Sequence, residues 1–212
     1  MALASWLDRV LYRHPFEGAS ARRYAERERP AFGDLDDRLL DALPALATAR
    51  YLLDLGFGPG AFAARAAARH PHLTVVAVDP SRDFARPRSS LAVLRAAGEA
   101  LPLADGTIDV AVCLSSIRHV HDRSRTLREL RRVVRRGGSL SIIELDPAAS
   151  PMRIAAHADH IRSTVLRRAF GPLVVKTAPR VELIEALARD AGWTVAARRD
   201  DAMQPVYILD LA

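Results

Sequence analysis

Three glycines at alternate positions follow an acidic residue in the segment 54–60, directly after an apolar run. An apolar run of this kind is typical of a buried parallel strand. Glycine allows a positive φ and lets a ligand approach where a Cβ atom would clash. The helix expected over 61–69 would point its free backbone N–H groups at this loop. The segment therefore predicts a nucleotide-type cofactor site.

The glycine segment alone leaves the identity of the cofactor open. Gly56, Gly58 and Ala61 also match the dinucleotide fingerprint, with Asp79 as the ribose-binding acid about 20 residues further on. A nicotinamide-dependent oxidoreductase is therefore one alternative.

Other segments carry more specific motifs. Residues 98–109 contain Glu-x-Leu-Pro followed by Ile-Asp, residues 117–120 read Ile-Arg-His-Val, and residues 132–138 end in two glycines. Together with segment 54–60, these motifs resemble those of the class I S-adenosylmethionine-dependent methyltransferases. The resemblance covers roughly residues 51–212, and it is to the small-molecule branch that includes quinone-biosynthesis-type enzymes. It implies methyl transfer to a small-molecule acceptor by in-line displacement, at O, N or C.

The resemblance also implies how S-adenosylmethionine is held. The methionine carboxylate would lie at the helix start, where anions are favoured, and the ammonium group near Asp54. Family members often carry an acid two residues before Glu99, where this chain has Ala97. Adenine binding would then rest on backbone groups near 99–101 and on apolar packing. The implied cofactor-binding residues are Asp54, Gly56, Phe57, Gly58, Gly60, Asp79, Pro80, Glu99, Ala100, Leu101 and Leu114.

Several side chains are candidates for the chemistry and for acceptor binding. The enzyme's main contribution to methyl transfer is to align the reacting atoms. His119 follows the expected fourth strand and titrates near neutrality, so it is the candidate catalytic base. Tyr24, Arg118, His157 and His160 are candidates for contacts with the acceptor. The i, i+3 spacing of the last two would permit metal ligation, but the sequence places no partner acid beside them, and no metal is predicted.

Strand and helix patterns alternate from residue 51 onward, which predicts a doubly wound, Rossmann-like α/β fold with a seven-stranded sheet ending in an antiparallel hairpin. The helix after the fourth strand is expected to end at a glycine pair, Gly137 and Gly138, acting as a C-cap. The expected strands are 51–55, 73–79, 91–94, 108–114, 139–145, 194–197 and 206–211, and the expected helices of the sheet layers are 61–69, 123–135 and 181–189.

Residues 1–48 are predicted to form an N-terminal helical cap, with a first helix that includes Trp6 and a charged helix that contains Tyr24. Residues 49–212 would form the methyltransferase domain, and cap and domain are expected to be one structural unit. Within the domain, 147–179 is interpreted as a lid over the site mouth, built around one helix at 152–170.

Composition narrows the class of protein. The chain has 212 residues, a net charge of +6 and a single cysteine, Cys113. The basic cluster 128–136 alternates with apolar residues at helical spacing, which favours the solvated face of a helix over an RNA-binding stripe. No Asn/Asp-Pro-Pro-Tyr run follows the fourth strand, which argues against an adenine-N6 RNA methyltransferase. The lone cysteine, the early charges and the lack of a long apolar run predict a cytoplasmic protein without a membrane span. A monomeric or homodimeric state is expected, and a nucleic-acid partner is not. A non-catalytic cofactor-binding partner subunit is the remaining alternative.

Overall fold

The computed structural model describes residues 16–161 and 163–212, which build a single seven-stranded sheet of order β3-β2-β1-β4-β5-β7-β6. Strand β7 runs antiparallel to both of its neighbours, whereas the pairs among β1 to β5 are parallel. The predicted Rossmann-like sheet with its terminal hairpin is therefore confirmed. The strands are β1 (Tyr51–Leu55), β2 (Thr74–Asp79), β3 (Ala92–Arg95), β4 (Ile108–Leu114), β5 (Val134–Leu145), β6 (Val195–Asp200) and β7 (Val206–Leu211).

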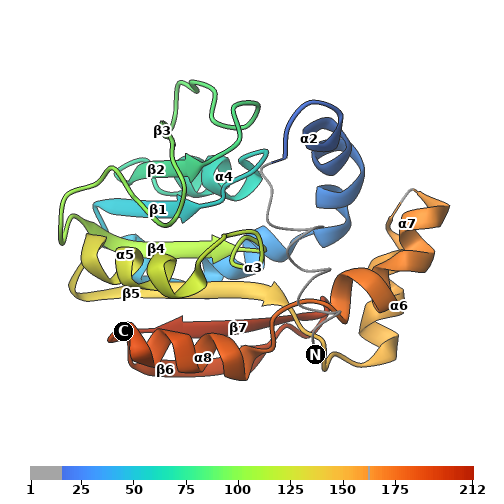
Figure 1. Cartoon of the computed structure of the whole chain (residues 1–212). Coiled ribbons are helices and arrows are strands. Elements are labelled where there is room, and N and C mark those ends of the chain that lie inside the picture. The colour runs from blue at the N-terminus through green and yellow to red at the C-terminus, as the bar shows by residue number, and fades with distance from the viewer. Residues whose placement is uncertain (1–15, 162) are drawn as a thin grey trace.

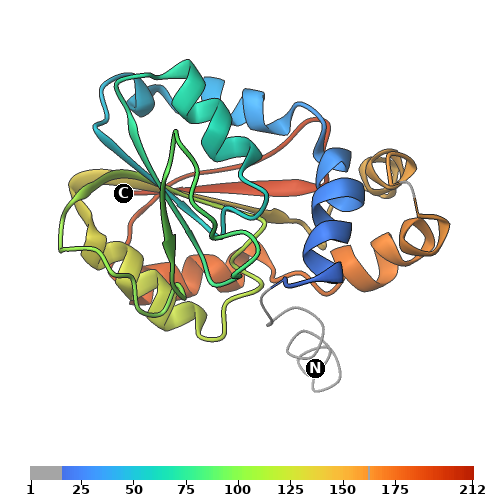
Figure 2. The same ribbon diagram turned by 90° about the horizontal axis from the view of Figure 1, so that it is seen from above.

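Helices cover both faces of the sheet, as the view from above shows (Figure 2). Helices α3 (Leu35–Asp41) and α4 (Ala61–Arg69) lie on one face, and α5 (Arg123–Val133) and α8 (Val181–Asp190) on the other. Successive strand residues point to opposite faces. Leu52 packs in the core beneath α3 and α4, whereas Leu53 packs in the core beneath α5 and α8. Because both faces are buried, the strands read as continuous apolar runs.

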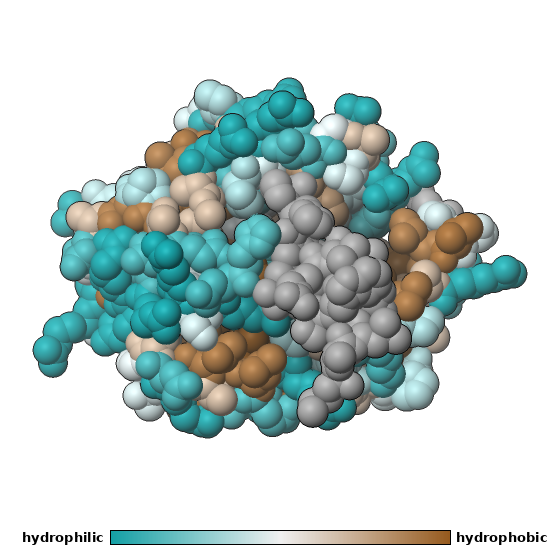
Figure 3. Space-filling view, viewed as in Figure 1, coloured by the Kyte–Doolittle hydropathy of each residue, from teal (hydrophilic) through white to brown (hydrophobic). Residues whose placement is uncertain are grey.

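Two helical segments lie beyond the carboxyl ends of the parallel strands (Figure 1). The cap segment comprises α2 (Ala19–Arg23), η1 (Tyr24–Glu28) and η2 (Arg29–Phe32). The lid segment comprises α6 (Pro151–Asp159), α7 (Thr164–Ala169) and η4 (Phe170–Val175), and α6 packs against η2 and η4. A further turn, η3 (Pro44–Ala47), links α3 to β1. Apolar side chains gather over α7 on the outer surface, where Val165 is exposed (Figure 3).

The prediction of one lid helix over 152–170 is wrong, because the segment folds into two helices. Ser150 and Ser163 each accept a hydrogen bond from a backbone N–H in the first turn of the helix that follows, at Arg153 and Leu166 respectively. A serine cap satisfies an N–H group that has no partner within the helix. The second cap therefore starts a new helix in the middle of the expected one.

The predicted boundary between α5 and β5 is also wrong. Helix α5 ends at Val133, the backbone of Val134 is already extended (φ −76°, ψ 128°), and β5 continues to Leu145. The glycine pair lies in a bulge where the β4–β5 register shifts. A Cβ atom on Gly138 would lie 2.6 Å from the carbonyl oxygen of Asp109. The glycines therefore allow close strand approach instead of capping a helix.

The remaining expectations differ less from the structure. Strands β1, β4 and β7 and helix α4 have the predicted bounds, and the other strand and helix ends differ by one to a few residues. Tyr24 lies in η1, which continues α2. The expected helix that includes Trp6 falls outside the described residues. In the part of the chain that the structure describes, the helices are all too short or too polar to span a bilayer.

Candidate cofactor and acceptor site

The glycine loop between β1 and α4 is held against the neighbouring strands. Gly56 has a φ of 72°, and its N–H donates to the carbonyl oxygen of Val78 at 2.7 Å. A Cβ atom on Gly56 would lie 2.4 Å from the Cβ of Ser116. Both the positive φ and the close approach therefore require glycine here. Gly60 occupies the N-cap position of α4, so the loop leads directly into the start of that helix.

Asp79 ends β2 and fixes the loop from the other side. Its Oδ2 accepts a hydrogen bond from the N–H of Gly58 at 3.0 Å, and its Oδ1 accepts one from the N–H of Ser81 at 2.8 Å. Burial raises the pKa of Asp79, and the two backbone N–H groups oppose that rise. Each carboxylate oxygen keeps a lone pair for a further donor. The carboxylate at the end of β2 can therefore accept hydrogen bonds from the hydroxyl groups of a ligand.

Asp54 lies in β1 and is 2 % exposed. Its Oδ2 has no hydrogen-bond partner among the described residues. Burial raises the pKa of Asp54 to about 7; the Arg29 guanidinium opposes the rise, and the carboxylates of Asp36 and Asp79 add to it. Arg29 is itself paired with Asp36. A small cavity beside the glycine loop is lined by Asp54, Arg29 and Tyr24. An unpartnered buried carboxylate oxygen at a cavity is suited to a cationic or hydrogen-bond-donating ligand.

A larger cavity, here the cofactor cavity, extends along the other side of the loop. It is lined by Gly56, Gly58, Asp79 and Glu99, with Tyr24 on the cap side. Gly56, Gly58 and Tyr24 also line the small cavity at Asp54. The two spaces therefore follow the glycine loop from the end of β1 to the segment after β3.

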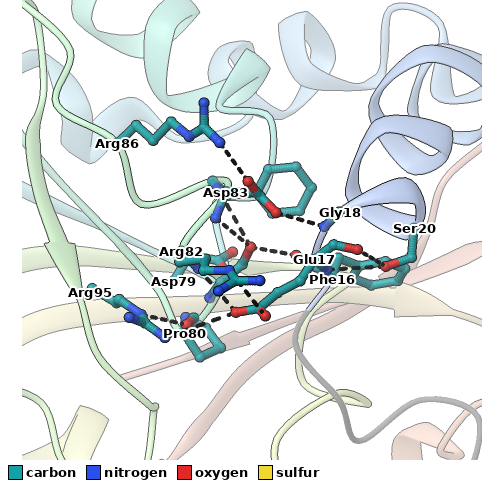
Figure 4. A network of polar contacts seen from close by, with 12 residues as sticks. Phe16, Glu17, Gly18, Ser20, Asp79, Pro80, Arg82, Asp83, Arg86 and Arg95 are labelled. Carbon is teal, nitrogen blue, oxygen red and sulfur yellow. Dashed lines mark hydrogen bonds and ion pairs between the residues drawn. The ribbon is translucent and has the colours of Figure 1, made fainter.

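A polar network fastens the cap segment to the loop that follows β2 (Figure 4). The N–H of Gly18 donates to Oδ2 of Asp83 at 2.6 Å, and the hydroxyl of Ser81 donates to the carbonyl oxygen of Phe16. Glu17 lies 3.4 Å from Arg82 in an ion pair. The network thereby holds the start of the cap segment next to the Asp79 end of the cofactor cavity.

A second cavity, here the acceptor cavity, has a volume of about 320 Å³ and lies between the cap and lid segments. Phe32, Phe170 and other apolar side chains form most of its wall. It shares four residues with the cofactor cavity: Phe16, Tyr24, Ser115 and His119. The Phe16 ring stacks on Tyr24 with centroids 5.0 Å apart and meets His119 edge-on at 5.2 Å. The two cavities therefore meet at a common wall.

Comparisons with known proteins agree with this geometry. Residues 53–142 match the family described as Methyltransferase domain. The chain is 35 % identical over 116 residues to the ubiquinone/menaquinone biosynthesis C-methyltransferase of Syntrophotalea carbinolica, covering 51 % of this chain and 49 % of that protein. It is 32 % identical over 121 residues to the demethylmenaquinone methyltransferase of Chlamydia pneumoniae, covering 54 % and 53 %.

Over its central segment, residues 53–142, the chain is therefore similar to S-adenosylmethionine-dependent methyltransferases. Its alignments span about half the length of these curated relatives. Its fold is similar to that of a crystallised methyltransferase from Aquifex aeolicus, with a TM-score of 0.71, 16 % identity, and coverage of 92 % of this chain and 98 % of the other. The family's cofactor is S-adenosylmethionine, which carries an ammonium group and a sulfonium. The unpartnered oxygen of Asp54, the strand-end carboxylate of Asp79 and the glycine cradle all fit that molecule.

The structure places most of the predicted cofactor residues of this chain along the two loop cavities. Phe57 and Leu114 line the small cavity, and Pro80 and Glu99 line the cofactor cavity. Glu99 also accepts a hydrogen bond from the N–H of Asp122 at 2.8 Å. Their contacts with S-adenosylmethionine stay predictions.

Three predicted cofactor residues lie outside both cavity walls. Gly60 is at the start of α4, Leu101 packs in the core with its N–H donating to Glu129 at 2.9 Å, and the N–H of Ala100 donates to the carbonyl oxygen of Ala97. The wall near Glu99 is formed instead by Ala97 and Gly98. The carbonyl oxygen of Ala97 and the N–H of Leu101 are therefore already engaged in hydrogen bonds within the chain.

The predicted substrate residues separate into two groups. Tyr24, Arg118 and His157 line the acceptor cavity, and His160 does not. Burial raises the pKa of Tyr24 to about 12, although Arg29 opposes the rise. The guanidinium of Arg118 donates to the carbonyl oxygen of Val174 at 3.0 Å and to the hydroxyl of Thr177 at 3.1 Å, which ties it to the lid side.

The two lid histidines also differ from each other. His157 is buried, hydrogen-bonds Gln204 through Nδ1 and stacks on Phe170 with centroids 4.5 Å apart. Burial lowers its pKa. His160 is exposed, and its Nδ1 bonds the carbonyl oxygen of Ala156 at 2.8 Å. Among residues 16–161 and 163–212, no three His, Cys, Asp or Glu side chains are grouped to hold a metal ion.

Sequence reasoning missed several residues of the acceptor cavity, among them Ser115 and Glu144. Ser115 follows β4 with a φ of 50°, lines both larger cavities, and its buried Oγ has no partner among the described residues. Glu144 is fully buried near the end of β5 and lines the acceptor cavity. The signal for Glu144 was available, because an acid inside an apolar strand is rarely buried without a purpose. Ser115 carries no such signal.

Proposed function

We propose that this protein transfers the methyl group of S-adenosylmethionine to a small-molecule acceptor bound in the acceptor cavity. The observation that carries the proposal is the common wall of Tyr24, Ser115 and His119 between a cavity along the glycine loop and a second, mostly apolar cavity. In-line displacement needs the methyl donor and the methyl acceptor to be bound next to each other, with the reacting atoms about 3 Å apart. Two cavities that meet at one wall satisfy that need.

The chain's own residues would divide the work as follows. Asp79 receives hydroxyl groups of the ribose, and Asp54 receives the ammonium group of the methionine end. The start of α4 favours the methionine carboxylate, because backbone N–H groups and the helix dipole point there. When bound, S-adenosylmethionine supplies an electrophilic methyl group on a sulfonium. Tyr24 and Phe16 separate the reacting atoms from solvent, since they cover both cavities.

His119 is the proposed proton acceptor. It lines both cavities, so its ring lies where an acceptor O–H, N–H or ring C–H would give up a proton. The names of two relatives, a C-methyltransferase of ubiquinone/menaquinone biosynthesis and a demethylmenaquinone methyltransferase, support a ring carbon as the methylated atom. The aromatic walls of the acceptor cavity support a ring-bearing acceptor. A cytoplasmic location and a monomeric or homodimeric state stay predictions.

Calorimetric titration with S-adenosylhomocysteine tests the first part of the proposal. The wild-type protein should bind it with micromolar affinity, and Asp79→Ala should lose that binding. Absence of binding to wild-type protein, or a preference for NAD in a thermal-shift screen, would refute it.

Methyl transfer from labelled S-adenosylmethionine to reduced naphthoquinones tests the second part. Cofactor binding without turnover on any acceptor would favour a non-catalytic subunit, and steeply salt-dependent RNA binding would favour an RNA methyltransferase.

A further inference from the structure

The lid segment exposes large apolar side chains on its outer surface. Met152 is 78 % exposed, Val165 75 % and Leu173 48 %, so the lid holds three of the six exposed large apolar side chains among the described residues. Apolar side chains gather over α7 at this end of the molecule (Figure 3). Single exposed apolar residues are common on protein surfaces, but a group of them usually marks a contact with a partner.

Helix α7 carries apolar side chains toward the protein as well as toward solvent. Leu166 and Ala169 line the acceptor cavity, and Val165 does not. Val165 instead lines a shallow hollow on the surface, together with Thr164 and Arg168. A surface helix normally confines its apolar residues to the side that packs on the core. The outer side of α7 therefore has the composition of a surface that a partner covers.

The charges of the lid segment are mainly positive. Residues 151–176 contain five basic side chains and one acidic side chain, Asp159, and the whole chain has a net charge of +6. Arg167 donates to the carbonyl oxygens of Asp159 and Ile161, which ties α7 to the end of α6. Arg168 is exposed and lies in the same hollow as Val165. Charge complementarity therefore favours a partner with an anionic surface.

The position of α7 favours a lipid surface over a folded protein. The helix lies at the edge of the molecule, well away from the sheet (Figures 1 and 2). A protruding surface of this kind can rest on a flat bilayer, whereas a protein partner would need a matching groove. Apolar side chains beside arginines are typical of segments in the interface of anionic membranes, because the apolar groups enter the headgroup region while guanidinium groups stay at the phosphates.

We propose that the outer surface of the lid, formed around Val165 and Arg168, docks the protein on a membrane that contains anionic lipids. Val165 enters the headgroup region, and Arg168 pairs with lipid phosphates. The contact is peripheral and needs no helix that spans the bilayer. Because Leu166 and Ala169 of the same helix line the acceptor cavity, docking brings the lid wall of that cavity next to the lipid. The proposal does not depend on methyl transfer, since Val165 and Arg168 line none of the three cavities of the site.

Sedimentation of the full chain with lipid vesicles tests the proposal. The protein should bind vesicles of equimolar phosphatidylglycerol and phosphatidylcholine at least about tenfold more tightly than vesicles of phosphatidylcholine alone, and added salt should weaken the binding. Arg168→Glu should weaken it at least about tenfold, because the variant changes two units of charge and each contributes roughly a fivefold factor. Val165→Gln should weaken it about threefold or more, since less apolar surface enters the lipid.

Matched controls lie on helices toward the other end of the molecule (Figure 1). Arg128→Glu makes the same charge change on exposed α5, and Leu183→Gln removes an apolar side chain that is 46 % exposed on α8. Both should bind within about twofold of wild type. A dye adds a direct readout, because the single cysteine, Cys113, is buried. An environment-sensitive dye on Val165→Cys should shift its emission to shorter wavelength on anionic vesicles, and one on Leu183→Cys should not.

The other outcomes would overturn the proposal. Wild-type protein that fails to bind anionic vesicles at low salt would refute it without any variant. Equal losses in Arg168→Glu and Arg128→Glu would indicate a non-specific attraction of the basic chain. A dimeric wild type that becomes monomeric in Val165→Gln, without binding to vesicles, would assign the surface to a second copy of the chain. Binding of S-adenosylhomocysteine is measured separately, so its loss would overturn the proposed function and leave the docking result standing.

Discussion

Replacing Asp79 by asparagine should weaken cofactor binding and folding by separable amounts. The carboxylate accepts two backbone hydrogen bonds, from Gly58 at 3.0 Å and from Ser81 at 2.8 Å. An amide offers one oxygen, and its NH₂ group would face the second N–H. One buried N–H would lose its partner, which costs roughly 1–3 kcal/mol of folding free energy. Urea unfolding should show a loss of this size without a change in the slope.

Asp79→Asn should also lower the affinity for the cofactor. The ribose hydroxyls would donate to a carboxylate in wild-type protein, and a hydrogen bond to a charged group contributes about 1.5–3 kcal/mol. Losing one such bond raises the dissociation constant for S-adenosylhomocysteine roughly 10- to 100-fold. Calorimetric titration of folded Asp79→Asn measures this.

Asp83→Asn is the matched control for the same chemical change. Its carboxylate also accepts a backbone N–H, from Gly18 at 2.6 Å, and pairs with Arg86, but it lies outside the cofactor cavity. Its affinity for S-adenosylhomocysteine should stay within about twofold of wild type. If Asp79→Asn binds as tightly as this control, the assignment of Asp79 to the ribose is wrong.

Three further variants test other parts of the site. Gly56→Ala should destabilise the protein by roughly 2–4 kcal/mol in urea unfolding, because it adds a clash with Ser116 to the cost of a positive φ, whereas Gly18→Ala, which has a positive φ and open space, should cost about 1 kcal/mol. For Asp54 the folded-state pKa of about 7 lies above the unfolded value of 3.8, so its contribution to stability is present below pH 4 and is lost as the pH rises toward 7. Asp54→Asn should therefore gain unfolding free energy relative to wild type across that window. We expect the affinity of wild-type protein for S-adenosylmethionine to rise between pH 6 and 8, and Asp54→Asn should abolish that rise. A constant difference across pH would contradict the assignment. His119→Gln should reduce methyl transfer about tenfold or more while S-adenosylhomocysteine affinity stays within about threefold, and equal losses of both would place His119 in cofactor binding alone.

Local patterns predicted the elements whose ends depend on neighbouring residues in the chain. Strands β1, β4 and β7 are mostly apolar runs, and each has the bounds that the sequence predicts. The glycine pair at 137–138 led to a wrong prediction of a helix C-cap. Its role depends on the carbonyl oxygen of Asp109, which lies far away in the sequence. A helical periodicity over 152–170 likewise does not reveal that Ser163 caps a second helix.

The same distinction holds for the site. The position of Asp54 and Asp79 at the cavities beside the glycine loop could be predicted because the ends of parallel strands meet at one edge of the sheet. Leu101 could not be excluded from the cofactor wall, since its N–H is occupied by Glu129 from another element. Ser115 combines a positive φ with an N–H that donates to the carbonyl oxygen of Ile143 in the neighbouring strand. These are tertiary facts with no local signature.

The order of the strands explains how the two cavities divide the site. Strand β4 lies between β1 and β5, so Ser115 at its end lies between Asp54 on one side and Glu144 on the other. Ser115 and His119, which follow β4, therefore line both cavities. Cofactor affinity should then respond to changes at the ends of β1 and β2, and acceptor selection to changes at the end of β5 and in the cap and lid segments. Changes just after β4 should affect turnover most, because that segment forms the wall where the two ligands meet.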